Sequence, residues 1–379
     1  MRTLLLTRNF PPLWGGMERL NWHLAAELAR RGPVRVVAPS GAAAHAPAGV
    51  EVAEVPGKPL WRFLSAALRV GMREARRFRP DVVLAGSGLT APMTLAAARS
   101  GGALAAAYVH GLDLTVRHLV YRALWLPAVR RLDRVIANSR ATANLALAIG
   151  VAEPRLTIVY PGVALPAWDE TERRALRQRF RAEHDLGERP LLLSVGRLTA
   201  RKGVGRFVRE VLPAIAREMP EVGLVIVGDV PKEALAARTE TPAMILEAAK
   251  AAGVAENVRW LGTRFGEDLS AAFFAADVHV FPVRHLPDDP EGFGMVAVEA
   301  AAHGLPTVAY ATGGVVDAVA EGISGRLVPP GDGAAFAKAV VEMLVRPLDA
   351  ELVRQFAERF AWPRFGAAIA DLLLACATT

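Results

Sequence analysis

The chain has 379 residues, 52% of them hydrophobic and 22% charged, which is typical of two or three domains with a substantial core and excludes wholesale disorder. Its one cysteine, Cys376, excludes an intramolecular disulfide and a cysteine-based zinc cluster. The net charge of +7 is uneven: residues 1–162 contain 21 Lys and Arg against 9 Asp and Glu, whereas the remainder contains 24 against 29. A basic first part can attract nucleic acid, an anionic membrane surface or an acidic substrate.

Short apolar runs alternate with longer helical stretches along the chain, which predicts an α/β protein with two doubly wound parallel sheets. Pro161 and Gly162 precede a charged helix, so we place a domain boundary there, between residues 1–162 and 163–361. A final helix over about residues 362–379, broken by Pro363, is expected to cross back to the first domain. Strands are expected at residues 3–7, 34–38, 81–85, 105–109, 134–138, 191–195, 223–228, 258–261, 278–281, 306–309 and 326–328, and helices at 17–30, 170–181 and 204–218.

The first loop carries two glycines, Gly15 and Gly16, between the first strand and the first helix. Glycines there let backbone N–H groups approach a phosphate at a helix N-terminus, although a plain strand-to-helix turn is an equally good interpretation. Residues 86–91, GSGLTA, fit a dinucleotide-binding fingerprint, but they lie several strands into the domain, and the next acidic residue, Asp113, belongs to another loop. An NAD-dependent oxidoreductase is therefore the weaker alternative, which a spectral test for bound nicotinamide would decide.

The second domain carries two stronger motifs. Arg197 and Lys202 follow a strand and lead into a helix, where a planar guanidinium and a point charge can hold a diphosphate; the alternative is two solvated cations on a loop. Glu291 precedes a helix start in which Gly292 and Gly294 leave room for a ligand. Glu299 follows among alanines, where a buried carboxylate needs partners that a ribose diol would supply, unless it lies on an exposed helix face.

Ten segments of the chain form an ordered series of motifs. They are FPPLWGGME (10–18), YVHGLD (108–113), NS (138–139), YPGV (160–163), VGRLTARKG (195–203), VIVGD (225–229), WLG (260–262), EGFGMVAVEAAAHGLP (291–306), GG (313–314) and GRLVPPGD (325–332). In this order and spacing they resemble a retaining nucleotide-sugar glycosyltransferase of family GT4, over nearly the whole chain. This resemblance implies the GT-B architecture, in which two Rossmann-like doubly wound domains face a central cleft, with the acceptor bound by the N-terminal domain and the donor by the C-terminal domain.

The resemblance also implies roles for individual residues. Gly15 and Gly16 match glycines near the diphosphate and the acceptor, and His110 matches a histidine near the reacting sugar. Arg197 and Lys202 match the pair that holds the donor diphosphate. Glu291 and Glu299 match the acidic pair that faces the sugar and binds the ribose. The backbone around Gly292, Phe293 and Gly294 would support sugar and phosphate, and the loop with Thr263 and Arg264 is where similar proteins place the base.

A hexosyltransferase of this kind needs no cofactor, only a GDP- or UDP-sugar as co-substrate, with mannose, glucose and N-acetylglucosamine all open. Retention in similar enzymes proceeds by front-face substitution, with the leaving phosphate accepting the acceptor's proton. The chain has no D-x-D triplet, so we expect no metal. The expected acceptor is a cell-envelope glycan or glycolipid. A sugar-nucleotide epimerase, or a catalytically silent binding subunit of the same fold, are the alternatives.

The expected location and partners depend on targeting segments, uncharged runs and an arginine-rich stretch of the sequence. No targeting segment is apparent, and the longest uncharged run, residues 82–98, contains two glycines and a proline, so we expect a cytoplasmic protein. Apolar residues recur at helical spacing between residues 61 and 78, with arginines on the remaining surface. This pattern favours a core-facing helix with solvated arginines over one that rests on an anionic membrane at its inner face. Nucleic acid is not expected as a partner, because no recognition motif accompanies the charge.

Overall fold

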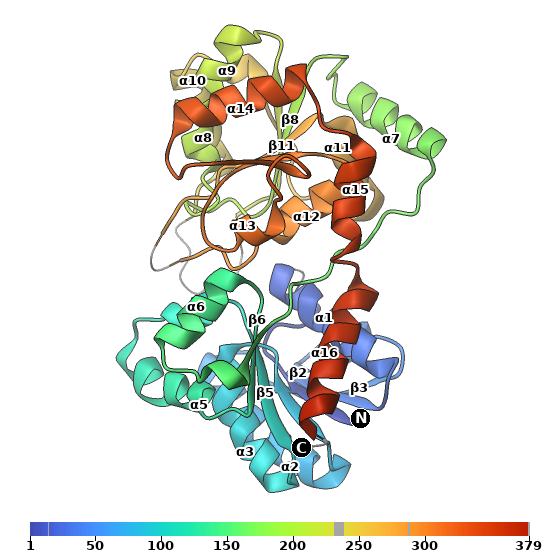
Figure 1. Cartoon of the computed structure of the whole chain (residues 1–379), viewed down its shortest axis with the longest axis vertical. Helices are drawn as coiled ribbons and strands as arrows, with labels where there is room; N and C mark the ends of the chain where they lie inside the picture. The colour runs from blue at the N-terminus through green and yellow to red at the C-terminus, as the bar shows by residue number, and fades with distance from the viewer. Residues whose placement is uncertain (14, 231–238, 287–288, 378–379) are drawn as a thin grey trace. The chain divides into compact units, whose positions relative to one another are not determined.

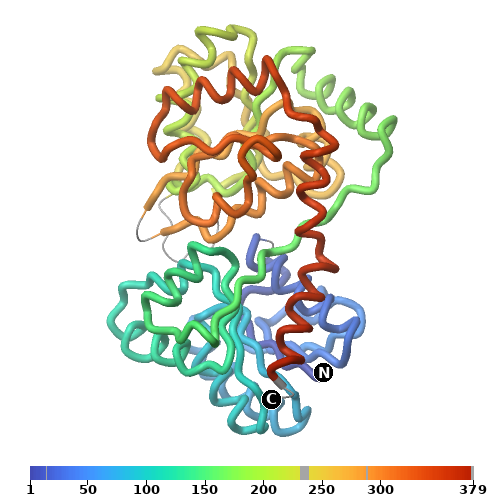
Figure 2. The backbone as a smooth tube through the Cα atoms, in the orientation of Figure 1, coloured from blue at the N-terminus to red at the C-terminus, as the bar shows by residue number. Residues whose placement is uncertain are grey.

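The computed structural model describes residues 1–13, 15–230, 239–286 and 289–377. The chain divides into two compact units, of which unit 1 comprises Met1–Gly162 with Phe360–Thr379 and unit 2 comprises Val163–Arg359. Figure 2 follows the chain from the blue start of unit 1 through unit 2 and back to unit 1 in the red C-terminal helix.

Unit 1 contains a parallel sheet of seven strands in the order β3-β2-β1-β4-β5-β6-β7 (Figure 1). The chain moves outward from β1 to β3 and then returns to the other side of β1 with β4. Loops that follow β1 and β4 therefore turn to opposite sides, which creates a switch point at which ligands bind in sheets of this kind. The strands are β1 Thr3–Leu6, β2 Val34–Pro39, β3 Val50–Val55, β4 Val82–Ala85, β5 Leu104–Val109, β6 Arg134–Ala137 and β7 Leu156–Ile158.

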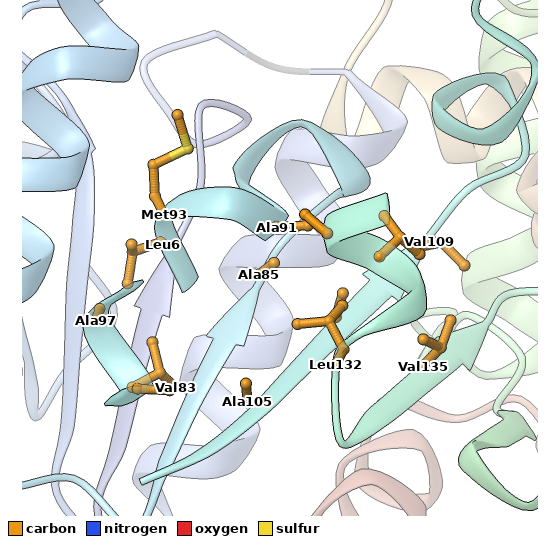
Figure 3. Close-up of a cluster of buried hydrophobic side chains, with 14 of the residues drawn as sticks. Leu6, Val83, Ala85, Ala91, Met93, Ala97, Ala105, Val109, Leu132 and Val135 are labelled. Atoms are coloured by element: carbon orange, nitrogen blue, oxygen red, sulfur yellow. The ribbon is translucent and has the colours of Figure 1, made fainter. Parts of the chain in front are cut away.

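Both faces of this sheet are covered, because alternate residues of a strand point to opposite sides. Leu4 and Leu6 face a core shared with several helices, among them the short helix α4 Leu112–Thr115, and Figure 3 shows part of this core around Leu6, Val83 and Ala105. On the other face, Tyr108 packs edge-on against Phe365 of the final helix. The helices of the first face are α2 Leu60–Phe78, α3 Ala91–Gly101, α5 Leu126–Arg130 and α6 Arg140–Ala148, and those of the second are α1 Gly16–Ala29 and α16 Trp362–Ala377.

Unit 2 contains a parallel sheet of six strands in the order β10-β9-β8-β11-β12-β13, which also reverses direction beside its first strand. Apolar side chains from both faces form separate cores, one with α8, α9, α10 and α14 and the other with α7, α11 and α12. The strands are β8 Leu191–Val195, β9 Gly223–Val227, β10 Val258–Trp260, β11 Val278–Phe281, β12 Thr307–Tyr310 and β13 Gly325–Val328. The helices are α7 Glu170–Glu183, α8 Val204–Glu210, α9 Leu212–Glu218, α10 Pro242–Ala251, α11 Gly266–Ala275, α12 Met295–Ala302, α13 Val315–Ala318, α14 Gly333–Val345 and α15 Ala350–Glu358.

The predicted fold class is confirmed, and the differences concern single elements. The helix expected over residues 204–218 is two helices, because the φ of Val211 is distorted to −110° and Pro213 offers no N–H to continue the first helix. Pro363 does not break the final helix but lies in its first turn, where a missing N–H costs little. Within the described residues, no helix combines the length and the apolar character needed to cross a membrane.

Candidate active site

Two loops of unit 2 meet at the carboxyl ends of β8 and β11, the strands at which the order of this sheet reverses. Gly203 ends the first loop with a φ of +72°, and a Cβ there would lie 2.2 Å from the Pro282 carbonyl oxygen, so only glycine fits. The Arg284 N–H also donates to the Arg201 carbonyl oxygen at 2.8 Å. These contacts fix the loop that follows β8 against the loop that follows β11.

An ion-pair cluster surrounds the Glu291 carboxylate on these loops. The Lys202 ammonium donates to Glu291 Oε2 at 2.8 Å, and the Arg201 guanidinium contacts the same oxygen. The Lys202 and Glu291 side chains are 13% and 10% exposed. Arg201 also forms an ion pair with Asp289, with 3.1 Å between Nε and Oδ1. Our sequence analysis missed Arg201, for which the only signal was its place directly before Lys202.

Burial and the charges of this cluster shift the pKa values of both Lys202 and Glu291. Burial lowers the pKa of Lys202 to about 8, because desolvation and the positive charges of Arg201 and Arg197 outweigh the attraction of Glu291. Burial alone would raise the pKa of Glu291, but Arg201 and Lys202 lower it well below its usual value. The Lys202 ammonium also lies 4.6 Å from the centre of the Phe281 ring, a cation–π contact. Glu291 is therefore ionised at neutral pH, and Lys202 titrates close to the physiological range.

The backbone after Glu291 is held by glycines that leave no room for side chains. Gly294 has a φ of +94° and precedes α12, and a Cβ there would lie 2.9 Å from the Phe281 ring. The Gly314 N–H donates to the Glu291 carbonyl oxygen at 2.9 Å, and a Cβ at Gly314 would overlap the carbonyl group of Gly292. Phe293 is buried beside them, and Glu299 lies half-buried on α12. The segment that follows Glu291 therefore has a fixed course up to the start of α12.

Of two further predicted site residues of unit 2, Arg197 lies near the Lys202–Glu291 pair and Arg264 lines a separate pocket. Arg197 is exposed on the loop after β8, close enough for its charge to lower the pKa of Lys202. Arg264 instead lines a pocket with His184 of the α7 region and Asp268 of α11. The structure thus brings Arg197, Lys202 and Glu291 together but directs the Arg264 side chain to another place.

In unit 1, the glycines of the first loop lie at the start of α1, where Gly15 is the N-cap and Gly16 the first helical residue. The Glu18 carboxylate occupies part of the space beside them, because a Cβ on Gly15 would lie 2.5 Å from Glu18 Oε2. Asn9 holds that carboxylate by donating from Nδ2 to Glu18 Oε1 at 2.8 Å. An anion that approaches the N–H groups of this helix therefore also meets the charge of Glu18.

His110 is held by the loop that follows β4. Its Nε2 lies 2.9 Å from the Gly86 carbonyl oxygen, which can only accept, so Nε2 carries a proton and donates it to that oxygen. The Asp113 carboxylate accepts from the His110 N–H at 3.0 Å and from the Gly88 N–H at 2.7 Å. The GSGLTA loop thus supports His110 and has one amide occupied by Asp113, which argues against its use for a dinucleotide. Sequence analysis also missed Asn21, a buried side chain whose Nδ2 donates to the Gly86 carbonyl oxygen.

Two family models match the chain. Glycosyltransferase Family 4 matches residues 14–165, and Glycosyl transferases group 1 matches residues 189–346. A GDP-mannose-dependent alpha-(1-6)-phosphatidylinositol monomannoside mannosyltransferase of Mycolicibacterium smegmatis is 31% identical over 98% of this chain and 97% of its own length. A D-inositol 3-phosphate glycosyltransferase of Salinispora arenicola is 32% identical, over 62% of this chain and 53% of its own length.

Two solved structures resemble this chain over nearly its whole length. Anabaena HepE in complex with UDP superposes with a TM-score of 0.79 at 21% identity and covers 99% of this chain and 100% of its own. WaaG, a glycosyltransferase involved in lipopolysaccharide biosynthesis, superposes with a TM-score of 0.71 at 20% identity, over 98% of this chain and 99% of its own. At these identities the likeness shows a shared fold.

Proposed function

The chain belongs to glycosyltransferase family 4 and has the GT-B fold, and from this we propose that it transfers a hexose, with retention of configuration, from a nucleotide-diphosphate sugar to a hydroxyl group of a glycan or glycolipid. The observation that carries the proposal is the buried Lys202–Glu291 pair at the switch point of the unit 2 sheet, where α/β proteins bind ligands. Because a full-length relative is named for GDP-mannose, GDP-mannose is the first donor to test.

In this proposal the donor binds unit 2. Lys202 and Arg197 neutralise the diphosphate, and positive charge placed where the leaving group gains negative charge lowers the barrier without a metal ion. Glu291 faces the donor sugar and Glu299 binds the ribose. The backbone of Gly292, Phe293 and Gly294 supports sugar and phosphate. The loop after Gly262 receives the base through its backbone, because the Arg264 side chain turns toward the pocket beside α7.

Unit 1 contributes the acceptor side in the same proposal. Gly15 and Gly16 offer backbone N–H groups at the start of α1, and His110, held through Nε2, directs its remaining ring nitrogen to a sugar hydroxyl. The departing phosphate takes the proton of the acceptor hydroxyl while the new bond forms on the same face of the sugar. The protein supplies orientation and positive charge to this step, and no side chain forms a covalent intermediate.

We also propose that unit 1 rests on an anionic membrane that carries the acceptor, at the cytoplasmic face. Helix α2 buries Phe63 and Ala67, whereas its arginines line a pocket on the outer side and its one acid, Glu74, is buried and paired with Arg35 and Arg73. Helix α3 contacts α2 and the π-helical turn Tyr121–Trp125, beside which Leu119 is 82% exposed. Cations and exposed apolar side chains on neighbouring helices suit an interfacial surface. The pocket-lining arginines are Arg69, Arg73, Arg76 and Arg77.

The test is an assay of GDP-mannose, UDP-glucose and UDP-N-acetylglucosamine, each with and without a phosphoinositol-type glycolipid acceptor. We expect release of the nucleoside diphosphate that the acceptor accelerates, an α-linked product from an α-donor, and activity that EDTA leaves unchanged. Conversion of the donor to an epimer would establish the epimerase alternative. Binding without turnover would establish a silent subunit, and loss of activity in EDTA would overturn the metal-independent mechanism.

A further inference from the structure

Arg201 links both acidic residues of the unit 2 cluster. The residue is 9% exposed, its guanidinium contacts the Glu291 carboxylate, and Nε lies 3.1 Å from Asp289 Oδ1. Its carbonyl oxygen accepts from the Arg284 N–H at 2.8 Å. A hydrogen bond therefore holds Arg201 at the backbone and two ion pairs hold it at the guanidinium, between the loop that follows β8 and the segment that leads to α12.

Glu291 has two cationic partners of different character. Lys202 and Arg201 both approach Oε2, but a lysine ammonium is a compact charge on a flexible stem, whereas the arginine fork is planar and here is held by Asp289 as well. A diphosphate that enters the site competes with Glu291 for the Lys202 ammonium, because a phosphate oxygen is also a charged acceptor. A buried carboxylate that loses its cation is costly to keep ionised.

We propose that Arg201, held by Asp289, is a positioning residue that keeps the Glu291 carboxylate in place when the Lys202 ammonium turns to the donor diphosphate. The inference rests on the proposed function of this site. Arg201 itself touches neither the sugar nor the phosphate in this arrangement. Its task is to make the movement of Lys202 possible without leaving Glu291 unpaired.

The test compares kinetics of Arg201→Gln, Arg201→Lys and Asp289→Asn with those of the wild type. Without Arg201, donor binding leaves Glu291 unpaired, so Arg201→Gln is expected to lower kcat about 10- to 100-fold, the usual cost of a misplaced group. The acidic limb of its kcat profile moves to higher pH, because Lys202 has then turned to the donor and Arg197 is the cation of the described residues that still acts on Glu291. Arg201→Lys restores most of kcat, and Asp289→Asn gives a smaller loss.

Arg206→Gln is the matched control, because Arg206 pairs with Glu210 on the surface of α8, and its kcat should stay within twofold of wild type. Melting temperatures show whether each variant is folded. Wild-type kcat and an unmoved acidic limb in a folded Arg201→Gln would overturn the inference while the proposed function stands, as would an equal loss in Arg201→Lys and Arg201→Gln. Absence of transfer or donor hydrolysis in the wild type with every donor would instead overturn the proposed function.

Discussion

Lys202 and Glu291 are the side chains whose removal should cost the most activity. In the proposed mechanism, Lys202→Ala removes a buried positive charge from the leaving diphosphate, and Glu291→Ala removes the carboxylate that is proposed to face the sugar. Each is expected to lower kcat by about 100-fold or more, as loss of one electrostatic contact to a transition state does. The measurement is steady-state transfer from GDP-mannose by folded variants. Lys338→Ala, which removes an exposed lysine of α14, is the control, and near-normal rates in either site variant would remove that residue from the site.

The pKa of Lys202 predicts how activity depends on pH. Since burial lowers this pKa to about 8, Lys202 is charged below that pH and loses its proton above it. We expect kcat/KM for the donor to fall about tenfold per pH unit above about pH 8, because this parameter reports the free enzyme. Lys202→Arg keeps its charge and should lose this alkaline limb even if its rate is lower. A wild-type profile that stays flat to pH 9.5 would contradict the assignment.

The candidate residues show where sequence reasoning stops. Lys202 and Glu291 could be proposed from their loops, because motif spacing reports where the backbone lies. The contact between Arg201 and Glu291 could not be predicted, because in the sequence Arg201 is one of several cations on a loop. Its role depends on the folded chain bringing the Glu291 segment next to that loop. The direction of Arg264 was also beyond the sequence, because it depends on the packing of α7 against α11.

Strand β11 carries a buried titratable group that ties stability to pH. His279 is fully buried, its Nδ1 lies 3.0 Å from Thr307 Oγ1, and burial lowers its pKa to about 3, with a smaller effect from Lys202. The unfolded chain takes up this proton below about pH 6.5 while the folded chain does not, so the free energy of unfolding falls as the pH drops from about 6.5 toward 3. Each proton corresponds to about 1.4 kcal/mol per pH unit.

His279→Gln should therefore flatten the pH dependence of unfolding by one proton between pH 4 and 6, as measured by urea titration. Its absolute stability is expected to be lower at pH 7, because the contact with Thr307 changes. His118→Gln, which removes an exposed imidazole instead of a buried one, is the control. An unaltered slope in His279→Gln would show that His279 takes up its proton in the folded state.

Most helices and strands at the centre of the two units can be predicted from the sequence, whereas the peripheral ones cannot. Buried parallel strands such as β1 and β8 are continuous apolar runs, which are visible without a structure. Strand β3 was not predicted, because it lies at the edge of the sheet and most of its side chains are exposed or half-buried, so it lacks a continuous apolar run. The division of residues 204–218 into α8 and α9 depends on a local backbone turn at Val211 that helical periodicity does not report.

The net charge of the chain is distributed unevenly between its two units, and this predicts which unit binds to anionic lipid. Unit 1 carries the basic excess, so full-length protein should sediment with vesicles of anionic phospholipid and be released by high salt. Replacing three arginines of α2, Arg69, Arg76 and Arg77, by Gln should weaken the affinity for these vesicles about 100-fold, at about 1 kcal/mol per charge. Replacing three exposed arginines of unit 2, Arg209, Arg217 and Arg346, should have little effect. Equal losses in both variants would rule out a specific surface.

Helix α16 joins the last part of the chain to the first. Trp362 stacks on His23 of α1 with ring centroids 4.0 Å apart, and a side chain on Gly162 would collide with the Trp362 ring. During synthesis, the ribosome must therefore translate all of unit 2 before α16 can pack against α1 and complete unit 1. Unit 2 has its whole sequence available earlier. The first unit of a nascent chain therefore stays exposed and unfinished while about 200 further residues emerge, which takes about 10 to 40 s at about 5 to 20 residues per second.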